Sequence, residues 1–172
     1  MKGSPPLKDM EQLVRAAQRG DTGAMNALVV ELSPYLARIC GSIALDEGDD
    51  ALQETMIAVL KNIRSLREPA ALWGWARRIA VREAVRLASR RQPWQSNLDL
   101  QNEPGSTPDL DETMDVAAVL RSLPAHQRAI LVLRDLEGLS EAEAARLLNV
   151  PQGTAKSRLH RAREAFRMRW ET

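Results

Sequence analysis

Three acidic side chains, Asp49, Asp50 and Glu54, are spaced so that their carboxylates could hold Mg²⁺ for phosphoryl transfer. Neither a glycine-rich phosphate loop nor an HExxH pattern accompanies them. A single cysteine, Cys40, with only two histidines elsewhere in the chain, is too few ligands for a structural zinc site. We therefore expect no catalytic residue, no metal and no cofactor, and an enzyme is the least favoured class of function.

The basic side chains could bind a polyanion, because they are concentrated in two blocks. The whole chain has a net charge of +1. Residues 61–91 nevertheless hold nine basic and two acidic side chains, and residues 116–172 hold ten basic and six acidic ones. One basic block is most often a solvated helix face. Two such blocks on a nearly neutral protein favour a nucleic-acid partner.

An acidic segment separates the two basic blocks. Residues 92–115 carry six acidic side chains and no lysine or arginine, and the segment contains three prolines. A stretch of about 20 residues without a helical pattern is uncommon inside one compact domain. We therefore expect an all-α protein of two small helical domains, residues 8–91 and 115–171, joined by an acidic flexible linker, residues 92–114. No apolar run reaches the length of a membrane-spanning helix, so we expect a cytoplasmic protein without membrane insertion.

The first domain has the pattern of four helices. An apolar face stops at Gly20, and Asp21 is an N-cap for a second helix in which Pro34 should produce a kink. A third helix follows Gly48. After a basic loop at residues 62–68, Pro69 should begin a fourth helix whose outer side is rich in arginine.

The second domain also has the pattern of four helices. Residues 116–123 predict a short helix. A second helix should begin at Pro124 and end at Gly138, with Gly138 itself in the left-handed conformation. Ser140 and Glu143 match a capping box for a third helix that ends at a tight turn containing Asn149. A long last helix should follow Pro151.

A short helix, a tight turn and a longer basic helix are typical of a helix-turn-helix, in which the second helix enters the major groove of DNA. A basic amphipathic helix could instead be solvated, or lie on a protein or membrane. The capped helix before it, with the small residues Ala144 and Ala145 for close crossing, favours DNA. The packing stripe of the last helix is predicted to consist of Ala155, Leu159, Ala162, Phe166 and Trp170. The DNA-contacting residues are predicted to be Gln152, Thr154, Lys156, Ser157 and Arg158 near base edges, with Arg161, Arg163 and Arg167 nearer phosphates or solvent.

Residues 123–164, LPAHQRAILVLRDLEGLSEAEAARLLNVPQGTAKSRLHRARE, resemble domain four of bacterial sigma factors, which reads the minus-35 promoter element. Residues 13–29, 48–63 and 71–91 resemble the opening, core-binding and promoter-melting helices of sigma domain two. Their order and spacing are similar to those of the extracytoplasmic-function (ECF) group. The chain differs from the usual family pattern at Met56, Arg82, Ala155 and Asn149.

The resemblance implies a non-enzymatic subunit of RNA polymerase that reads promoter DNA. Its partners would be the β′ clamp helices and β flap of core polymerase, the promoter and an anti-sigma factor, with the protein associated with the nucleoid when in the holoenzyme. The implied contacts with the clamp helices are Asp49, Asp50, Leu52, Gln53 and Glu54. The implied minus-10 contacts are Arg64, Arg67, Trp73, Trp75, Arg77 and Arg78, with only one of the two tryptophans facing DNA.

A second hypothesis is a stand-alone helix-turn-helix regulator whose first domain senses a ligand or dimerises. Such a domain has no need for the nine basic side chains between Lys61 and Arg91. A regulator of this kind would also bind duplex DNA without polymerase.

Overall fold

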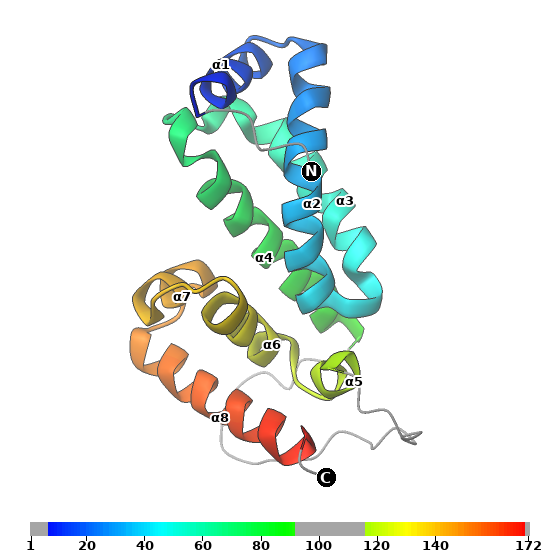
Figure 1. Ribbon diagram of the computed structural model, residues 1–172, viewed down its shortest axis with the longest axis vertical. Coiled ribbons are helices and arrows are strands. Elements are labelled where there is room, and N and C mark those ends of the chain that lie inside the picture. The colour runs from blue at the N-terminus through cyan, green and yellow to red at the C-terminus, as the bar shows by residue number, and fades with distance from the viewer. Residues whose placement is uncertain (1–6, 92–115, 171–172) are drawn as a thin grey trace.

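The computed structural model describes residues 7–91 and 116–170, and within them every regular element is helical (Figure 1). The predicted all-α fold is confirmed. The linker, residues 92–114, lies outside the described residues. The first half contains α1 (Leu7–Gln18), α2 (Thr22–Ala44), α3 (Gly48–Asn62) and α4 (Leu72–Arg91). The second half contains α5 (Val116–Arg121), α6 (Ala125–Leu131), the π-helical turn η4 (Val132–Leu136), α7 (Glu141–Leu148) and α8 (Gln152–Trp170).

Helix α2 starts and ends through local backbone signals. Gly20 has a φ of +93°, and the Asp21 side chain accepts a 2.8 Å hydrogen bond from the backbone N–H of Ala24. The predicted N-cap is therefore confirmed. The helix continues through Pro34, and it ends where Leu45 has a φ of +56°.

Close contact between two glycines sets the position of α3 against α2. A Cβ atom built on Gly48 would lie 2.8 Å from the Cα of Gly41. A side chain at Gly48 would push the start of α3 away from α2. Two 3-10 turns, Ile63–Ser65 and Pro69–Ala71, then lead into α4, so Pro69 begins a turn and the helix itself begins at Leu72.

The apolar side chains of α2 form the centre of the first domain. Fully buried residues along it are Leu28, Leu32, Leu36, Ile39 and Ile43. Residues 22–65 are long and apolar enough to cross a membrane by length and composition, which the sequence prediction missed. The stripe packs among α1, α3 and α4, so α2 is apolar because it is the core helix of this domain.

The second domain follows the predicted order with different helix ends. The helix predicted over residues 116–123 ends at Arg121, and the one predicted from Pro124 to Gly138 becomes π-helical from Val132. Gly138 has a φ of +66°, as predicted. The π-helical turn widens the helix before that glycine, a change that apolar spacing does not reveal.

The turn between α7 and α8 has the predicted chemistry. Ser140 Oγ accepts from the Glu143 backbone N–H at 3.2 Å, and the Glu143 carboxylate accepts from the Ser140 backbone N–H at 2.8 Å. Asn149 closes α7 in the left-handed conformation, with a φ of +53°. These contacts fix the angle at which α8 leaves α7.

The prediction that Trp170 belongs to the packing stripe of α8 is wrong. Ala155, Leu159 and Ala162 are buried, and Phe166 packs against the core. Trp170 is 47% exposed and stacks on Phe166, with 5.9 Å between the ring centroids. The packing stripe therefore ends at Phe166, one turn before the helix ends at Trp170.

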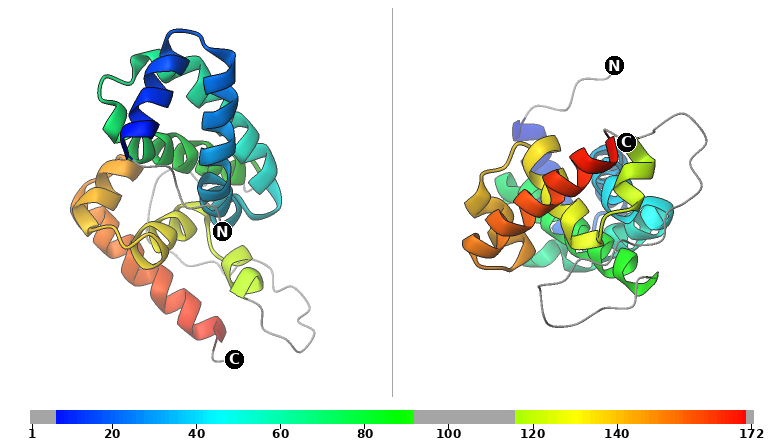
Figure 2. Two further views of the ribbon diagram at one scale, coloured as in Figure 1. Left: turned by 45° about the horizontal axis from the view of Figure 1, so that its top comes forward. Right: turned by 90° about the horizontal axis from the view of Figure 1, so that it is seen from below.

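The two domains pack directly on each other. Helices α6 and α7 lie against α4, and α6 also contacts α2 (Figure 2). Apart from Val119, the buried apolar side chains of both domains belong to one contiguous cluster. Arg128 of α6 is 4% exposed, and its Nε donates a 2.8 Å hydrogen bond to the carbonyl of Ile43 at the end of α2. Its Nη1 donates to the carbonyl of Leu123. Burial lowers the pKa of Arg128.

Substitution Arg128→Ala should lower the free energy of unfolding by at least about 2 kcal/mol, because buried carbonyls lose a charged donor. Arg121→Ala is the control, since Arg121 forms an exposed 3.4 Å pair with Asp46 across the same junction. That change should cost less than about 1 kcal/mol. Urea unfolding followed by circular dichroism measures both, and equal losses would contradict the role of Arg128.

Substitution Glu143→Ala should destabilise the protein at neutral pH and have little effect in acid. Hydrogen bonds from the Ser140 hydroxyl and backbone N–H lower the pKa of Glu143. A carboxyl group with a lowered folded-state pKa stabilises above its unfolded-state pKa, and this contribution is lost as the pH falls through the folded-state pKa. Urea unfolding at about pH 7 and at successively lower pH compares Glu143→Ala and the control Glu141→Ala, which keeps the capping box, with the unsubstituted protein. A difference from the unsubstituted protein that persists in acid would contradict this expectation.

Candidate nucleic-acid interface

Helix α8 exposes polar and basic side chains opposite its buried stripe. The predicted residues Gln152, Lys156, Ser157 and Arg161 are exposed, and Thr154 and Arg158 are half-buried. Ser157 Oγ donates to the carbonyl of Thr154 at 3.0 Å, within the first two turns of the helix. The structure therefore brings all six predicted side chains to the accessible part of α8. Their position at the helix start is the geometry that a recognition helix requires.

Arg163 is held by the protein itself, although it was predicted to meet phosphate or solvent. Its Nε donates to Asp135 Oδ2 at 3.2 Å, and its Nη2 donates to Oδ1 of the same carboxylate. This hydrogen-bonded pair raises the pKa of Arg163. Asp135 lies in η4, 28 residues before its partner in the sequence, so no local pattern indicated the pair.

The predicted minus-10 residues form a second basic surface around the start of α4. Arg64, Arg67 and Arg78 are exposed. The two tryptophans have different surroundings. Trp73 packs edge-on against Tyr35, with ring centroids 5.5 Å apart, whereas Trp75 lines a cleft between the domains. Of the two rings, Trp75 is thus the candidate for stacking on a base.

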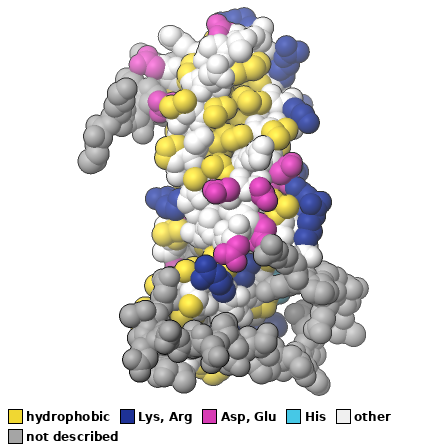
Figure 3. Space-filling model, turned by 90° about the vertical axis from the view of Figure 1, so that its right-hand side faces the viewer, with side chains coloured by type: hydrophobic (Ala, Val, Ile, Leu, Met, Phe, Trp, Pro, Cys, Tyr) yellow, Lys and Arg dark blue, Asp and Glu magenta, His cyan; other side chains and the backbone are white. Residues whose placement is uncertain are grey.

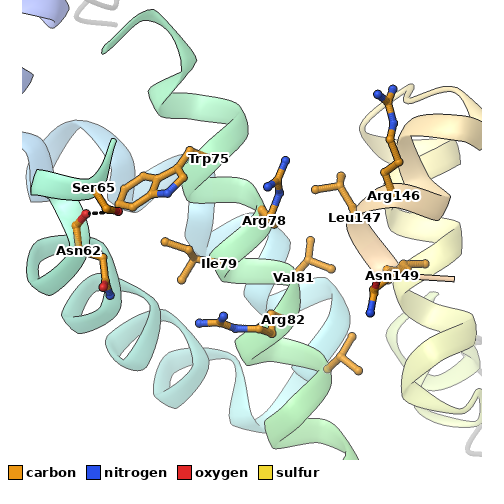
Figure 4. A pocket seen from close by; sticks show the side chains of 12 residues that line it. Asn62, Ser65, Trp75, Arg78, Ile79, Val81, Arg82, Arg146, Leu147 and Asn149 are labelled. Atoms are coloured by element: carbon orange, nitrogen blue, oxygen red, sulfur yellow. Dashed lines mark hydrogen bonds between the residues drawn. The ribbon is translucent and has the colours of Figure 1, made fainter. Parts of the chain in front are cut away.

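The cleft has a volume of about 970 Å³ and lies between α4 and α7 (Figure 4). Trp75 and Arg78 project from α4, and Leu147 faces them from α7. Arg82 and Arg146 also line the cleft, and among residues 7–91 and 116–170 no acidic side chain does. A lining of arginines, one indole and aliphatic side chains can hold an anion together with an aromatic ring.

Gln18 of α1 positions the loop before α4, and the sequence prediction missed it. Its Nε2 donates to the carbonyl of Ile63 at 3.0 Å and to that of Leu66 at 2.7 Å. Buried side chains of Ile63 and Leu66 anchor the same loop, and Arg64 and Arg67 alternate with them on the outside. The apolar residues Ile63 and Leu66, set among basic ones, were the available signal that this loop is anchored.

The predicted polymerase-binding residues lie along α3. Asp49, Asp50, Gln53 and Glu54 are exposed, and Leu52 is half-buried. Ile57, one turn further on, is 39% exposed. Figure 3 views the molecule from the side on which α3 lies in Figure 1, and it shows acidic side chains interspersed with apolar ones. Within residues 7–91 and 116–170 no three histidine, cysteine or acidic side chains gather as metal ligands.

Comparison with protein families gives two matches. Residues 28–93 match the model of Sigma-70 region 2, and residues 113–166 match that of Sigma-70 region 4. The region 2 match includes α4 and the loop before it. The region 4 match includes the helix-turn-helix.

Comparison with individual proteins extends over almost the whole chain. The ECF RNA polymerase sigma-E factor of Escherichia coli K12 is 36% identical over 173 residues, covering 90% of each chain. The ECF RNA polymerase sigma factor SigM of Mycobacterium tuberculosis is 33% identical, covering 88% of this chain and 80% of the other.

Two solved structures share the fold. CnrH in complex with the cytosolic domain of CnrY aligns with a TM-score of 0.62 at 22% identity, covering 94% of this chain and 97% of the other. The sigma factor RpoE in complex with the anti-sigma factor NepR from Bartonella quintana aligns with a TM-score of 0.61 at 23% identity, covering 86% and 96%. With the sequence matches, these findings show that the chain belongs to the ECF group of the sigma-70 family and is a sigma factor that directs transcription initiation by RNA polymerase.

Proposed function

We propose that this sigma factor uses three separate surfaces: α8 for duplex DNA at the minus-35 element, α4 and its preceding loop for the minus-10 element, and α3 for core polymerase. The observation that carries the proposal is the two-sided nature of α8. Its stripe from Ala155 to Ala162 is buried, and polar and basic side chains occupy the accessible side of its first turns. The functional units would be residues 8–91 and 115–171, with residues 92–114 as the linker.

At the minus-35 element, the start of α8 would enter the major groove. Arg158 can donate two parallel hydrogen bonds to guanine, and Gln152 can pair with adenine. Lys156 and Arg161 suit phosphate oxygens. Because Asp135 engages Arg163, we assign that arginine to positioning within the domain.

At the minus-10 element, Trp75 would stack on an unpaired base while Arg78 and the exposed loop arginines hold phosphates. Single strands are typically bound by cationic grooves with aromatic platforms. The ring of Trp73 is already packed on Tyr35, so we assign Trp73 to support of the surface.

Core polymerase would bind the acidic and apolar side of α3 through its β′ clamp helices. The β flap would contact the second domain, where Met168 and Trp170 are 67% and 47% exposed. The protein would act without catalysis of its own, in the cytoplasm, and on the nucleoid when in the holoenzyme. The anti-sigma complex of a protein with the same fold supports an anti-sigma partner here.

The alternative of a stand-alone regulator has less support. It requires a sensory or dimerisation domain before the helix-turn-helix, whereas residues 28–93 match Sigma-70 region 2. The favoured function therefore uses both basic blocks for DNA.

Mixing the purified protein with core polymerase should yield a complex on native gels and run-off transcripts from a cognate promoter. Glu54→Lys should weaken the complex at least tenfold, because it reverses a charge on the proposed docking surface. Asp9→Lys makes the same charge change on an exposed site of α1 and should leave binding unchanged. Failure of the unsubstituted protein to bind core polymerase would refute the proposal.

Substitution Arg158→Ala should cost about 1–3 kcal/mol of holoenzyme binding to the cognate promoter, selectively at one base pair of the minus-35 element. Arg167→Ala, in the last turns of α8, should weaken binding by a similar amount for every base at that position. Competition between promoters substituted one base pair at a time measures both effects. A uniform loss for Arg158→Ala would show a phosphate contact in place of a base contact.

A further inference from the structure

Glu137, just after η4 in the second domain, is surrounded by donors from the first domain. Tyr35 Oη donates a 2.8 Å hydrogen bond to Oε2, and Arg38 Nη2 donates a 2.9 Å hydrogen bond to Oε1. Arg77 Nη1 lies 3.9 Å from Oε2. The Glu137 side chain is only 4% exposed. A carboxylate this far out of water requires such partners, and these partners reach it across the junction between the domains.

The donors are themselves fixed in place. The ring of Tyr35 packs against Trp73, and the guanidinium of Arg38 lies 5.7 Å from the Tyr35 ring centroid. Arg77 Nη1 donates to Tyr35 Oη at 3.5 Å. Burial and the hydrogen bond with Glu137 raise the pKa of Tyr35, so its hydroxyl keeps the proton that it donates. We refer to Tyr35, Arg38, Arg77 and Glu137 as the interdomain latch.

The latch engages part of the surface proposed to open the minus-10 element. Arg77 belongs to that surface, and its side chain is 22% exposed in the latched arrangement. Trp75 and Arg78 next to it face α7 across the interdomain cleft. The minus-35 residues at the start of α8 are left accessible in the same arrangement. Closure thus engages Arg77 and places Trp75 and Arg78 in the cleft, whereas Arg64, Arg67 and the start of α8 stay exposed.

We infer that the latch holds the free protein in a closed state that masks the α4 part of its minus-10 surface, and that Glu137 occupies Arg77 in place of a DNA phosphate. The inference rests on the proposed function of α4. Carboxylate and phosphate oxygens accept the same charge-assisted hydrogen bonds from a guanidinium. Binding of a single strand to Arg77 and release of Glu137 are therefore coupled, and a ligand that prefers the open state shifts the equilibrium towards it.

The closed state is tested first by a distance, without DNA or polymerase. Spin labels at Asn26→Cys in α2 and Met168→Cys in α8, in a Cys40→Ala background, report on the separation of the domains. Glu137→Ala should raise the population at long distances about tenfold or more, because it removes charge-assisted hydrogen bonds. Tyr35→Phe keeps the ring on Trp73 and removes one donor, so it should open the protein less.

The masking is tested by the affinity of the free, unlabelled protein for a fluorescent oligothymidine of about 12 nucleotides. Glu137→Ala should bind it about tenfold more tightly than the unsubstituted protein. Asp135→Ala is the matched control, since it removes the same charge two residues away and breaks a pair inside the second domain. It should leave the distances unchanged and raise the affinity much less.

Unchanged distances in Glu137→Ala, with helical content retained, would overturn the latch. Longer distances without tighter oligothymidine binding would overturn the masking, and would count against the proposed role of α4 while leaving closure intact. Equal gains in Glu137→Ala and Asp135→Ala would show a general charge effect and would also overturn the masking.

Discussion

Burial of a guanidinium group requires oxygen atoms that accept its hydrogen bonds, and this constraint divides the arginines of the described residues by role. Arg128 is buried because main-chain carbonyls at the ends of α2 and α5 accept its donors. Arg163 lies against a carboxylate of its own domain. Arg64, Arg67 and Arg78 remain at the surface, where phosphates can supply the oxygens. The fold thereby separates structural guanidinium groups from those available to nucleic acid.

Packing between helices decides where the available groups point. The close approach of Gly48 to Gly41 sets the position of α3, which carries the acidic surface. The buried stripe of α2 positions α4, which carries the arginine-rich surface. The capping box and the left-handed Asn149 fix α8. Because each of these features belongs to the same domain as the side chains that it orients, each basic surface is shaped within its own domain. Their relative position depends instead on the junction between the domains.

Local features were predictable from the sequence, and long-range ones were not. The N-cap at Asp21, the capping box at Ser140 and the turn at Asn149 follow from residue types within four positions of each other. The partners Tyr35 and Glu137 are 102 residues apart, so no periodicity links them. The π-helical turn of η4 and the exposure of Trp170 depend on neighbouring helices, which spacing along one helix does not encode. The exposed positions at the start of α8 were predictable because a helix-turn-helix is itself a local motif.

We propose that the two basic surfaces bind two different forms of promoter DNA, duplex at α8 and single strand at α4. The most direct measurement is site-specific photocrosslinking in the assembled holoenzyme, with a photoreactive amino acid at Ser157 or at Trp75. We expect Ser157 to crosslink to duplex DNA near the minus-35 element. Trp75 should crosslink to the non-template strand of the minus-10 element only after strand opening. Crosslinks from both positions to protein alone, or from Trp75 to closed duplex only, would contradict the claim.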